Sequence, residues 1–231
     1  MEVNPVLRVS TMTYISNLNT EIDLKRLFDA VDIDEDLKYI EYGALNQKGQ
    51  KSSKSSNSRK IQKKFFYNQI TAHIFEGKIV NVKIFNNGKI QMTGIKNEEQ
   101  GIKTLNKVVS KLKNLDKELL ETILTNQDLT LEKGKIAMIN TDFDCGFKVK
   151  REVLQRLVTD KGYYSSFEPT IYPGVNIKYY FNKDKQNTGI CNCEGKCNGK
   201  GKDGFCKKIT VAVFNSGKII ITGGQSYEQL N

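Results

Sequence analysis

Alternating apolar and polar positions form two matching hairpin patterns, one beginning at Ile84 and the other at Val213. The first reads IFNNGKIQMTG and the second reads VFNSGKIIITG. Side chains of a strand alternate between its two faces, and an Asn-x-Gly turn between two such stretches is typical of a tight β-hairpin. We therefore predict an internal repeat, and the whole fold has to be interpreted through it.

The repeat extends upstream of both hairpins. Residues 7–18 and 136–147 are predicted to be strands. Each is followed by a stretch with helical periodicity, at about 21–31 in the first copy and 149–159 in the second. Each half of the chain is thus expected to begin with a strand and a short helix.

Downstream of the first hairpin, residues 97–124 are predicted to form one long helix. Apolar residues recur there at three- and four-residue steps, with lysines between them. Asn97 is a suitable N-cap, and Glu98 and Glu99 place negative charge in the first turn, where the helix dipole favours it. In the second copy the chain ends at Ser226–Asn231, so the last helix is expected to be cut short.

The pattern predicts two half-domains, 1–127 and 131–231. Either half alone would leave a sheet edge unpaired, so we expect the halves to share one continuous sheet. A Ser/Lys-rich insertion at about 47–64 interrupts the first half and is expected to be a mobile, solvated loop. A Gly/Lys/Asn-rich insertion at about 182–207 interrupts the second half.

The charge of the chain narrows the choice of partner. The 231 residues carry 36 Lys+Arg against 26 Asp+Glu, a formal net charge of +10. This excess favours a polyanionic partner, with nucleic acid first, and a solubilising lysine surface is the alternative. No apolar run approaches the roughly 20 residues of a membrane-spanning helix, and the N-terminus lacks the layout of a secretory signal. An intracellular protein is expected.

Three motifs resemble a known family. Ser165–Gly174 reads SSFEPTIYPG and is similar to the SSYEPELFPG segment of the TATA-box-binding protein family. Both hairpins match the FxxGKxxxTG motif at the places where that family carries it. On these residues the chain is identified as a divergent member of the family, similar in its insertions to members encoded by large DNA viruses.

The resemblance implies an α+β fold: a pseudo-twofold saddle of two direct repeats, with a curved antiparallel sheet and helices on the convex face. It implies a transcription initiation factor that binds and bends A+T-rich double-stranded DNA in the minor groove. Expected partners are general transcription factors of the IIB and IIA type or RNA polymerase, in the nucleus or a viral replication compartment. The rival interpretation is a scaffold of the same fold that has lost specific bending and acts through protein partners.

Family members push aromatic wedges between base steps, and a wedge must be large, apolar and held on a stiff turn. Phe85 and Phe214 precede Asn-x-Gly turns, and Tyr172 precedes Pro-Gly. For the fourth wedge we favour Phe66, with Leu45 and Phe65 as alternatives. Each of these side chains could instead be an ordinary aromatic or apolar group at a strand end. The four expected DNA-intercalating residues are Phe85, Phe214, Tyr172 and Phe66.

The face toward the minor groove is expected to be small and mostly uncharged, because A·T pairs offer only acceptors there. By resemblance and strand alternation this face holds Thr11, Thr13, Gln91, Thr93, Met138, Asn140, Ile220 and Thr222. Thr11 and Met138 stand where the family has asparagines. We therefore expect a looser preference for A·T at the centre of the site.

Phosphate contacts and a partner surface also follow from the resemblance. The expected phosphate-binding lysines are Lys89, Lys96, Lys178, Lys208 and Lys218. Lys178 and Lys208 replace arginines of the family, which keeps the charge but loses bidentate geometry. Singly, each lysine could equally be a solvated surface charge. In the loop that presents Tyr172, Glu168 and Ile171 are expected to contact a IIB-type factor.

Four cysteines, Cys191, Cys193, Cys197 and Cys206, lie close together in the second insertion and have no counterpart in the cellular family. Four thiolates can surround one tetrahedral structural zinc, and a reducing compartment argues against disulfides. Reduced free cysteines in a loose loop are the alternative. The fifth, Cys145, is expected to be a small buried residue.

Catalytic motifs are missing from the sequence: it has no P-loop, nucleophile elbow or Cys–His pairing. The single histidine, His73, lies in a strand-like stretch and is expected to be structural. Asp142 and Asp144 share a strand face and are expected to be solvated. We expect a non-enzymatic protein.

Overall fold

The computed structural model describes residues 7–51, 66–185 and 187–230, which form two compact units. The N-terminal unit spans Met12–Ala137. The C-terminal unit combines Met138–Asn231 with the described part of Met1–Thr11. The units differ from the predicted halves at two points: residues 131–137 belong to the N-terminal unit, and the start of the first strand belongs to the C-terminal unit.

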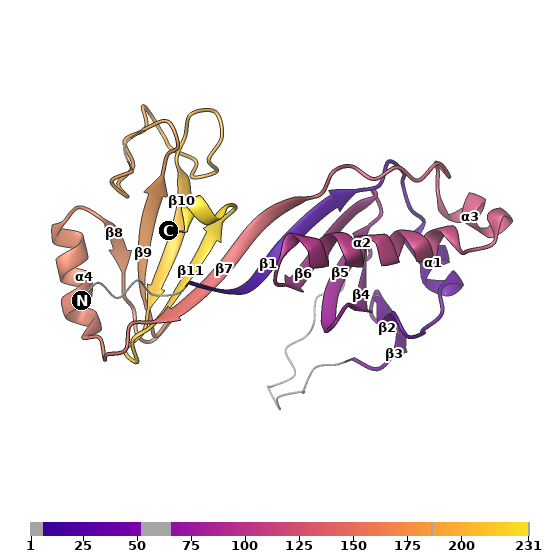
Figure 1. Ribbon diagram of the computed structural model, residues 1–231, viewed down its shortest axis with the longest axis horizontal. Coiled ribbons are helices and arrows are strands. Elements are labelled where there is room, and N and C mark those ends of the chain that lie inside the picture. Colours follow the sequence, from indigo (N-terminus) through magenta and orange to yellow (C-terminus); the bar gives the residue numbers. More distant parts are fainter. Residues whose placement is uncertain (1–6, 52–65, 186, 231) are drawn as a thin grey trace. The chain divides into compact units, whose positions relative to one another are not determined.

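The N-terminal unit contains an antiparallel sheet in the order β3-β2-β4-β5-β6-β1 (Figure 1). Its strands are β1 (Arg8–Asn17), β2 (Leu37–Tyr42), β3 (Asn46–Gly49), β4 (Gln69–Phe75), β5 (Ile79–Phe85) and β6 (Lys89–Ile95). β3 lies in the insertion that was expected to be a mobile loop, so that expectation is wrong for its first residues. The rest of the insertion, 52–64, lies outside the described residues.

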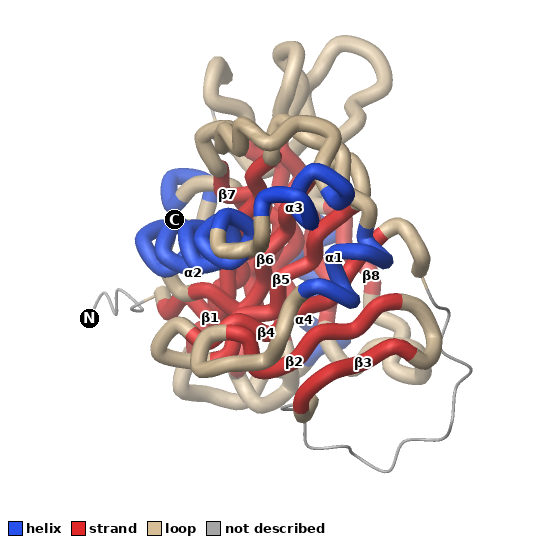
Figure 2. Tube along the Cα trace, turned by 90° about the vertical axis from the view of Figure 1, so that its right-hand side faces the viewer, coloured by secondary structure: helices blue, strands red, loops and turns tan. Residues whose placement is uncertain are grey.

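Three helices cover one face of this sheet (Figure 1, Figure 2). They are α1 (Leu24–Ala30), α2 (Glu98–Lys113) and α3 (Lys117–Ile123). α2 packs on β4 and β6, while α1 packs on β2, β4 and α3. The core between helices and strands includes Met12, Tyr14, Ile90, Leu105 and Leu112, each at most 5% exposed.

The long helix predicted over 97–124 is broken into α2 and α3. Asn97 caps α2 as expected, with its side chain accepting a hydrogen bond from the Gln100 amide at 2.9 Å. α2 ends at Lys113, and the Asp116 side chain then accepts from the amides of Glu118 and Leu119. Asp116 therefore starts a second helix, because its carboxylate satisfies backbone donors that a continuous helix would have bonded internally.

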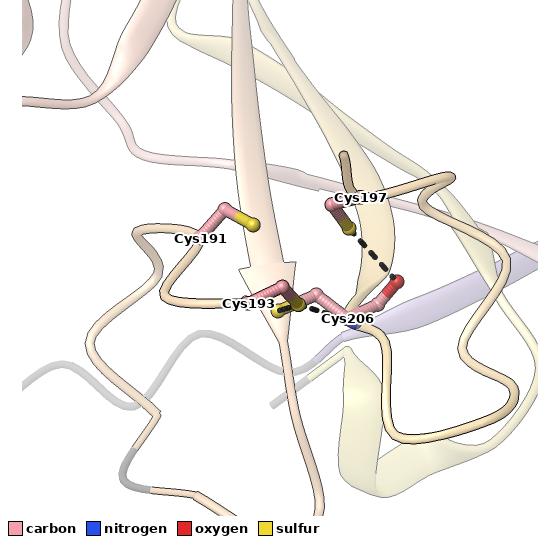
Figure 3. Close-up of side chains that lie close together, drawn as sticks. All are labelled: Cys191, Cys193, Cys197 and Cys206. Atoms are coloured by element: carbon pink, nitrogen blue, oxygen red, sulfur yellow. Dashed lines mark hydrogen bonds between the residues drawn. The ribbon is translucent and has the colours of Figure 1, made fainter. Parts of the chain in front are cut away.

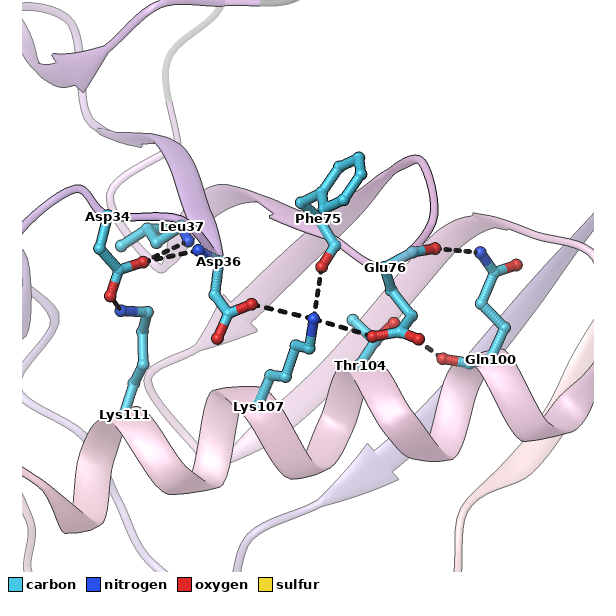
Figure 4. Close-up of polar contacts among 9 residues, drawn as sticks. All are labelled: Asp34, Asp36, Leu37, Phe75, Glu76, Gln100, Thr104, Lys107 and Lys111. Atoms are coloured by element: carbon cyan, nitrogen blue, oxygen red, sulfur yellow. Dashed lines mark hydrogen bonds and ion pairs between the residues drawn. The ribbon is translucent and has the colours of Figure 1, made fainter.

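Lysines on the exposed face of α2 tie the helix to the loops that flank β2 and β4 (Figure 4). The Lys107 ammonium lies 2.9 Å from carboxylate oxygens of both Asp36 and Glu76 and donates to the Phe75 carbonyl at 2.8 Å. These two carboxylates raise the pKa of Lys107. One turn further on, Lys111 pairs with Asp34. α2 is thus fixed by its polar face as well as by its apolar one.

The C-terminal unit contains an antiparallel sheet in the order β7-β11-β10-β9-β8. Its strands are β7 (Lys135–Asp144, from Met138 onward in this unit), β8 (Tyr164–Ser166), β9 (Val175–Phe181), β10 (Lys207–Val213) and β11 (Lys218–Gly224). The helix α4 (Arg151–Asp160) packs on β8 and β9 (Figure 1). After β11 the described part of the chain continues into a 3-10 turn, η1 (Tyr227–Gln229).

The apolar face of the C-terminal sheet is less completely covered. None of the α4 residues is buried. A groove of about 380 Å³ remains beside η1 on the face opposite the one that carries Lys178 and Lys208. It is lined in part by Tyr179, Ile209, Val211, Ile221 and Leu230.

Both hairpin turns need glycine. Gly88 has φ +79°, and a Cβ there would clash with the Thr20 carbonyl oxygen. Gly217, its counterpart in the second repeat, has φ +92°, and its Cβ would clash with the Phe147 carbonyl oxygen. The two turns of the predicted repeat therefore share both a positive φ and a close contact with a backbone carbonyl.

Among the described residues, every helix is too short or too polar to span a bilayer.

Candidate nucleic-acid interface

Each sheet has an open face that its helices leave free. In β1 and β6, Thr13 pairs with Thr93 and Ile15 pairs with Gln91, and all four are half-buried. Their neighbours along the strands, such as Met92, point into the core. The face on which the sequence predicted Thr13, Gln91 and Thr93 is thus the open face of the N-terminal unit.

The strand register adds residues that sequence reasoning did not single out. Lys83 of β5 pairs with Gln91, and Asn81 pairs with Thr93, so both belong to the same open face. The alternation of β5 was visible in the sequence. The register between β5 and β6 depends on the turn that joins them. This register places Asn81 and Lys83 beside Thr93 and Gln91.

The C-terminal unit has a corresponding open face. Asn140 pairs with Thr222, and Ile220 pairs with Asp142 on one side and with Ala212 on the other. Thr11 and Met138 are half-buried. The side-chain oxygen of Asn140 is buried and has no hydrogen-bond partner within the described part of the chain.

Asp142 is buried, contrary to the prediction from the sequence. Asp142 was expected to be solvated, but it is only 8% exposed, and its carboxylate lies 2.7 Å from the Arg8 guanidinium. The pairing with Arg8 compensates the charge that burial would otherwise disfavour. Asp144, on the same face, is exposed and pairs in register with Lys218.

The predicted wedges Tyr172 and Phe214 lie against each other. Their ring centroids are 5.7 Å apart and the rings meet edge to face at 61°. Gly174 allows this contact, since a Cβ there would lie 2.9 Å from the Tyr172 ring and 3.2 Å from the Phe214 ring. The turn that carries Phe214 is closed by a hydrogen bond from the Gly217 amide to the Phe214 carbonyl at 3.0 Å. Both rings are half-buried and held by stiff backbone.

In the loop before β9, the predicted wedge Tyr172 and the predicted partner-binding residue Ile171 differ in exposure. The Glu168 carbonyl accepts from the amides of Ile171 and Tyr172, at 3.0 and 2.9 Å. Tyr172 packs on Phe214, whereas Ile171 is 83% exposed. Arg151 of α4 holds the end of the loop by donating to the Pro173 carbonyl at 2.5 Å.

The register points to Tyr67, rather than Phe66, as the counterpart of Tyr172. Phe85 pairs with Gln69 in β4. The β9–β10 ladder, continued by one residue beyond its Val213–Val175 pair, sets Phe214 opposite Gly174. Two residues before Gln69 is Tyr67, as Tyr172 is two residues before Gly174.

The packing of Tyr67 agrees with this placement. A Cβ on Gly43 would lie 2.7 Å from the Tyr67 ring, and Tyr67 meets Tyr42 edge to face with centroids 6.2 Å apart. Exposure does not separate the candidates, because Tyr67, Phe66 and Leu45 are all exposed, at 65%, 58% and 93%. The third alternative for the fourth wedge, Phe65, lies outside the described residues.

Four of the five predicted phosphate lysines lie on the open faces. Lys89 pairs with Asn17, Lys218 with Asp144, Lys208 with Tyr180 and Lys178 with Thr210. The fifth, Lys96, lies beyond the end of β6 in the turn into α2.

Lys178 is the most enclosed of these lysines. Its ammonium donates to the Thr210 hydroxyl at 2.9 Å. Burial lowers the pKa of Lys178, and the nearby charge of Lys208 lowers it further. An anion placed beside both ammonium groups would relieve this repulsion.

At the outer edge of the N-terminal sheet, His73 belongs to a polar cluster. It is 7% exposed, and its ring centroid lies 5.1 Å from that of Tyr39. The Tyr39 hydroxyl donates to Glu41 at 2.8 Å. Burial lowers the pKa of His73, the charge of Lys51 lowers it further and Glu41 opposes the shift. The His73 Nδ1 atom is buried without a hydrogen-bond partner among the described residues, and the structural role of His73 stays a prediction.

The four cysteines of the second insertion converge on one point (Figure 3). Their sulfur atoms all lie within 4.8 Å of one another. The insertion joins β9 to β10. Cys145 is half-buried rather than buried and lies apart from this cluster, with its thiol near the Phe147 carbonyl.

Backbone amides point at two of the sulfurs. The Cys206 amide donates to Cys193 Sγ at 3.3 Å, and the Gly199 amide donates to Cys197 Sγ at 3.4 Å. The Cys206 amide is the largest cause of the lowered pKa of Cys193. Donation of this kind stabilises negative charge on sulfur, which is the form that binds metals. Burial instead raises the pKa values of Cys197 and Cys206, so it is the closeness of the four sulfurs that allows the cluster to hold a metal ion.

Two repeated units, each an antiparallel sheet with helices on one face and a polar open face on the other, define the α+β fold of the TATA-box-binding proteins. The TBP of Methanococcus jannaschii superimposes with a TM-score of 0.58 at 18% identity, over 97% of this chain and 91% of that one. This likeness confirms the predicted fold class.

A sequence relative carries the same family name. The chain is 29% identical, over 97% of its length, to a TATA-box-binding protein-like protein of Acanthamoeba polyphaga mimivirus. It spans 62% of the length of that relative. No protein-family model matches the chain. Together the two likenesses confirm the resemblance that the sequence motifs indicated.

Proposed function

We propose that this protein is a non-enzymatic transcription initiation factor that binds and bends A+T-rich duplex DNA through the minor groove. Its partners would be general transcription factors of the IIB and IIA type or RNA polymerase, in the nucleus or a viral replication compartment. The names of the viral and archaeal proteins to which the chain is similar support this class of function.

The observation that carries the proposal is the aromatic pair of Tyr172 and Phe214 at the end of an open sheet face. Wedging a side chain between base steps costs a few kcal/mol of stacking, so the wedge must not yield. The two rings support each other, and Gly174 and the Gly217 turn fix the backbone beneath them. Phe85 has the same position ahead of the Gly88 turn in the N-terminal unit.

The open faces supply the other two requirements for minor-groove binding. Threonine, glutamine and asparagine side chains offer donors to the acceptors on the groove floor. Lysines at the strand ends can neutralise phosphates, which supplies much of the affinity and its salt dependence. We infer that Glu168 and the exposed Ile171 form the docking point for a IIB-type factor, because they lie on the outer side of the loop that holds Tyr172.

A second candidate, a scaffold that no longer bends DNA, is favoured by one observation. The open face of the C-terminal unit carries Asp142 and Asp144, and like charge repels phosphate. Arg8 neutralises Asp142, and Lys218 lies across from Asp144. We therefore keep DNA binding as the first candidate.

The deciding experiment measures binding and bending of A+T-rich and G+C-rich duplexes as salt is varied. We compare the wild type with a Phe85→Ala/Phe214→Ala double variant. We expect wild type to bend the A+T-rich duplex and the double variant to bind at least about tenfold more weakly, without bending. Tyr227→Ala, in η1 beside the groove on the other sheet face, is the matched control and should bind as wild type does.

A wild type that binds neither duplex, or that binds without bending and is unaffected by the double substitution, would favour the scaffold.

We also propose that the cysteine cluster holds a structural zinc ion. Zinc–sulfur bonds of about 2.3 Å in a tetrahedron place sulfurs about 3.8 Å apart. The distance of 3.3 Å between Cys193 and Cys206, and the 4.8 Å limit for the set, bracket that value. Metal analysis of protein purified without chelator should give about one zinc per chain, and Cys193→Ser/Cys197→Ser should lose it. Cys145→Ser is the control and should keep the metal, whereas a wild type free of metal would contradict the proposal.

A further inference from the structure

We propose that the metal-binding insertion, residues 182–206, positions Lys208 and Lys178 for contact with DNA phosphates, so that metal loading controls how tightly the C-terminal unit holds DNA. This inference rests on the proposed function, and it assigns the cysteine cluster a role in DNA affinity rather than in folding alone.

The backbone of Lys208 is bonded directly to the cluster. Lys208 follows the metal ligand Cys206 by two residues at the start of β10. Its amide donates to the Gly199 carbonyl at 3.0 Å, and the Gly199 amide in turn donates to Cys197 Sγ at 3.4 Å. The Gly201 amide donates to the Cys206 carbonyl at 3.1 Å. Two of the four ligands are therefore closely connected to this lysine through the chain or through hydrogen bonds.

The side chain of Lys208 is supported by the same segment. A Cβ on Gly199 would lie 2.9 Å from Lys208 Cβ and 3.6 Å from its Cε, so the Gly199 backbone runs along the aliphatic stem. Gly199 has φ +68°, a backbone conformation that residues other than glycine rarely adopt. The stem of Lys208 is thus ordered before any ligand binds, and less rotamer freedom is lost on binding.

Lys178 lies beside Lys208 on the same open face. Lys178 pairs with Thr210, two residues along β10 from Lys208, and its ammonium is held by the Thr210 hydroxyl. Burial lowers the pKa of Lys178, and the charge of Lys208 lowers it further, so the two ammonium groups repel each other. A phosphate oxygen is the ligand that converts this repulsion into attraction.

The insertion is held by hydrogen bonds rather than by buried side chains. Within residues 182–185 and 187–206, only Asn182, Gly189 and Cys206 are buried. Ile190 is 40% exposed, and the segment has no apolar core of its own. Because metal binding supplies the ordering energy of such a loop, its removal is expected to release Gly199 from Lys208.

The test compares zinc-loaded full-length protein with the same protein after chelation. Binding to a fluorescent A+T-rich duplex is measured by anisotropy between about 50 and 200 mM salt. We expect chelation to weaken binding about tenfold and to reduce the salt slope by about one to two, the contribution of two lysines. Reloading with zinc should restore both values, and an unchanged far-ultraviolet circular dichroism spectrum should show that the sheets persist.

Variants separate positioning from general loss of structure. Lys178→Gln/Lys208→Gln should bind zinc normally, bind DNA weakly and no longer respond to chelation. Lys202→Gln, another lysine of the insertion, is the control and should keep the full response. A wild type that binds DNA with the same affinity and salt slope with and without zinc overturns this inference and leaves the proposed function intact. A wild type that binds no duplex in either state overturns both.

Discussion

At the scale of single residues, His73 makes stability depend on pH. Burial lowers its pKa in the folded protein, so the unfolded chain takes up a proton more readily. The stability is then complete above the unfolded pKa of about 6.5 and declines as pH falls below it. We expect wild type to lose up to about 1.4 kcal/mol more than His73→Gln between pH 7.5 and 5.5, measured by urea unfolding. Equal losses in the two proteins would show that His73 is not responsible.

Gly217 is a residue for which backbone geometry alone predicts a loss. Ala at this position must adopt φ +92° and place its Cβ against the Phe147 carbonyl, so we expect Gly217→Ala to cost about 2–4 kcal/mol. Gly146→Ala is the matched control. Gly146 has φ +79° with open space around it, so only about 1 kcal/mol should be lost. Thermal unfolding of both variants checks the difference, and equal melting temperatures would contradict the close approach.

Residues whose role follows from alternation were predictable, while those that depend on register were not. Thr13 and Thr93 fall on the open face because side chains of a strand alternate. Tyr67 was not among the candidates for the fourth wedge, because the sequence does not specify the path of the insertion before it. The choice between Phe66 and Tyr67 stays a prediction. Asp142 was missed because its partner, Arg8, is 134 residues away in the chain.

At the scale of elements, α2 depends on its polar face. Lys107→Met removes the partner of two carboxylates and of the Phe75 carbonyl, all partly shielded from solvent. We expect a cost of about 1–2 kcal/mol in urea unfolding. Lys103→Met is the control, because Lys103 makes an exposed pair with Glu99 one turn away, and it should cost clearly less than Lys107→Met. A similar cost for both would mean that the contacts of Lys107 add nothing.

The start of a helix was predictable where a capping side chain marks it. It was hard to predict where apolar periodicity continues past a capping residue. Asn97 was recognisable as a cap from its position before Glu98 and Glu99. Apolar periodicity continues past Lys113, so the break at Asp116 was not expected. The Asp116 carboxylate accepts hydrogen bonds from the Glu118 and Leu119 amides, and these local bonds outweigh the continuation of the helix there.

At the scale of the whole molecule, the two repeats share a hydrogen bond at matching positions of the sequence. The Lys96 amide donates to the Gln100 side chain at 2.9 Å, and at the matching position of the second repeat the Gln225 amide donates to the Gln229 side chain at 2.7 Å. The same contact therefore begins α2 and η1. The repeat could be recognised from the sequence because turns and caps are local. The convergence of four cysteines on one centre depends on the path of a long loop, which spacing alone leaves open.

The chain order of the C-terminal unit has a consequence for synthesis on the ribosome. The N-terminal unit is one continuous stretch, Met12–Ala137, and can close as soon as that stretch has emerged. The C-terminal unit needs the first residues of the chain: Ser10 donates to the Asn140 carbonyl and Arg8 pairs with Asp142. Contacts of such long sequence separation form late, because the loop between them must close first. Arg8 and Ser10, which are made before the N-terminal unit, thus reach their place after it.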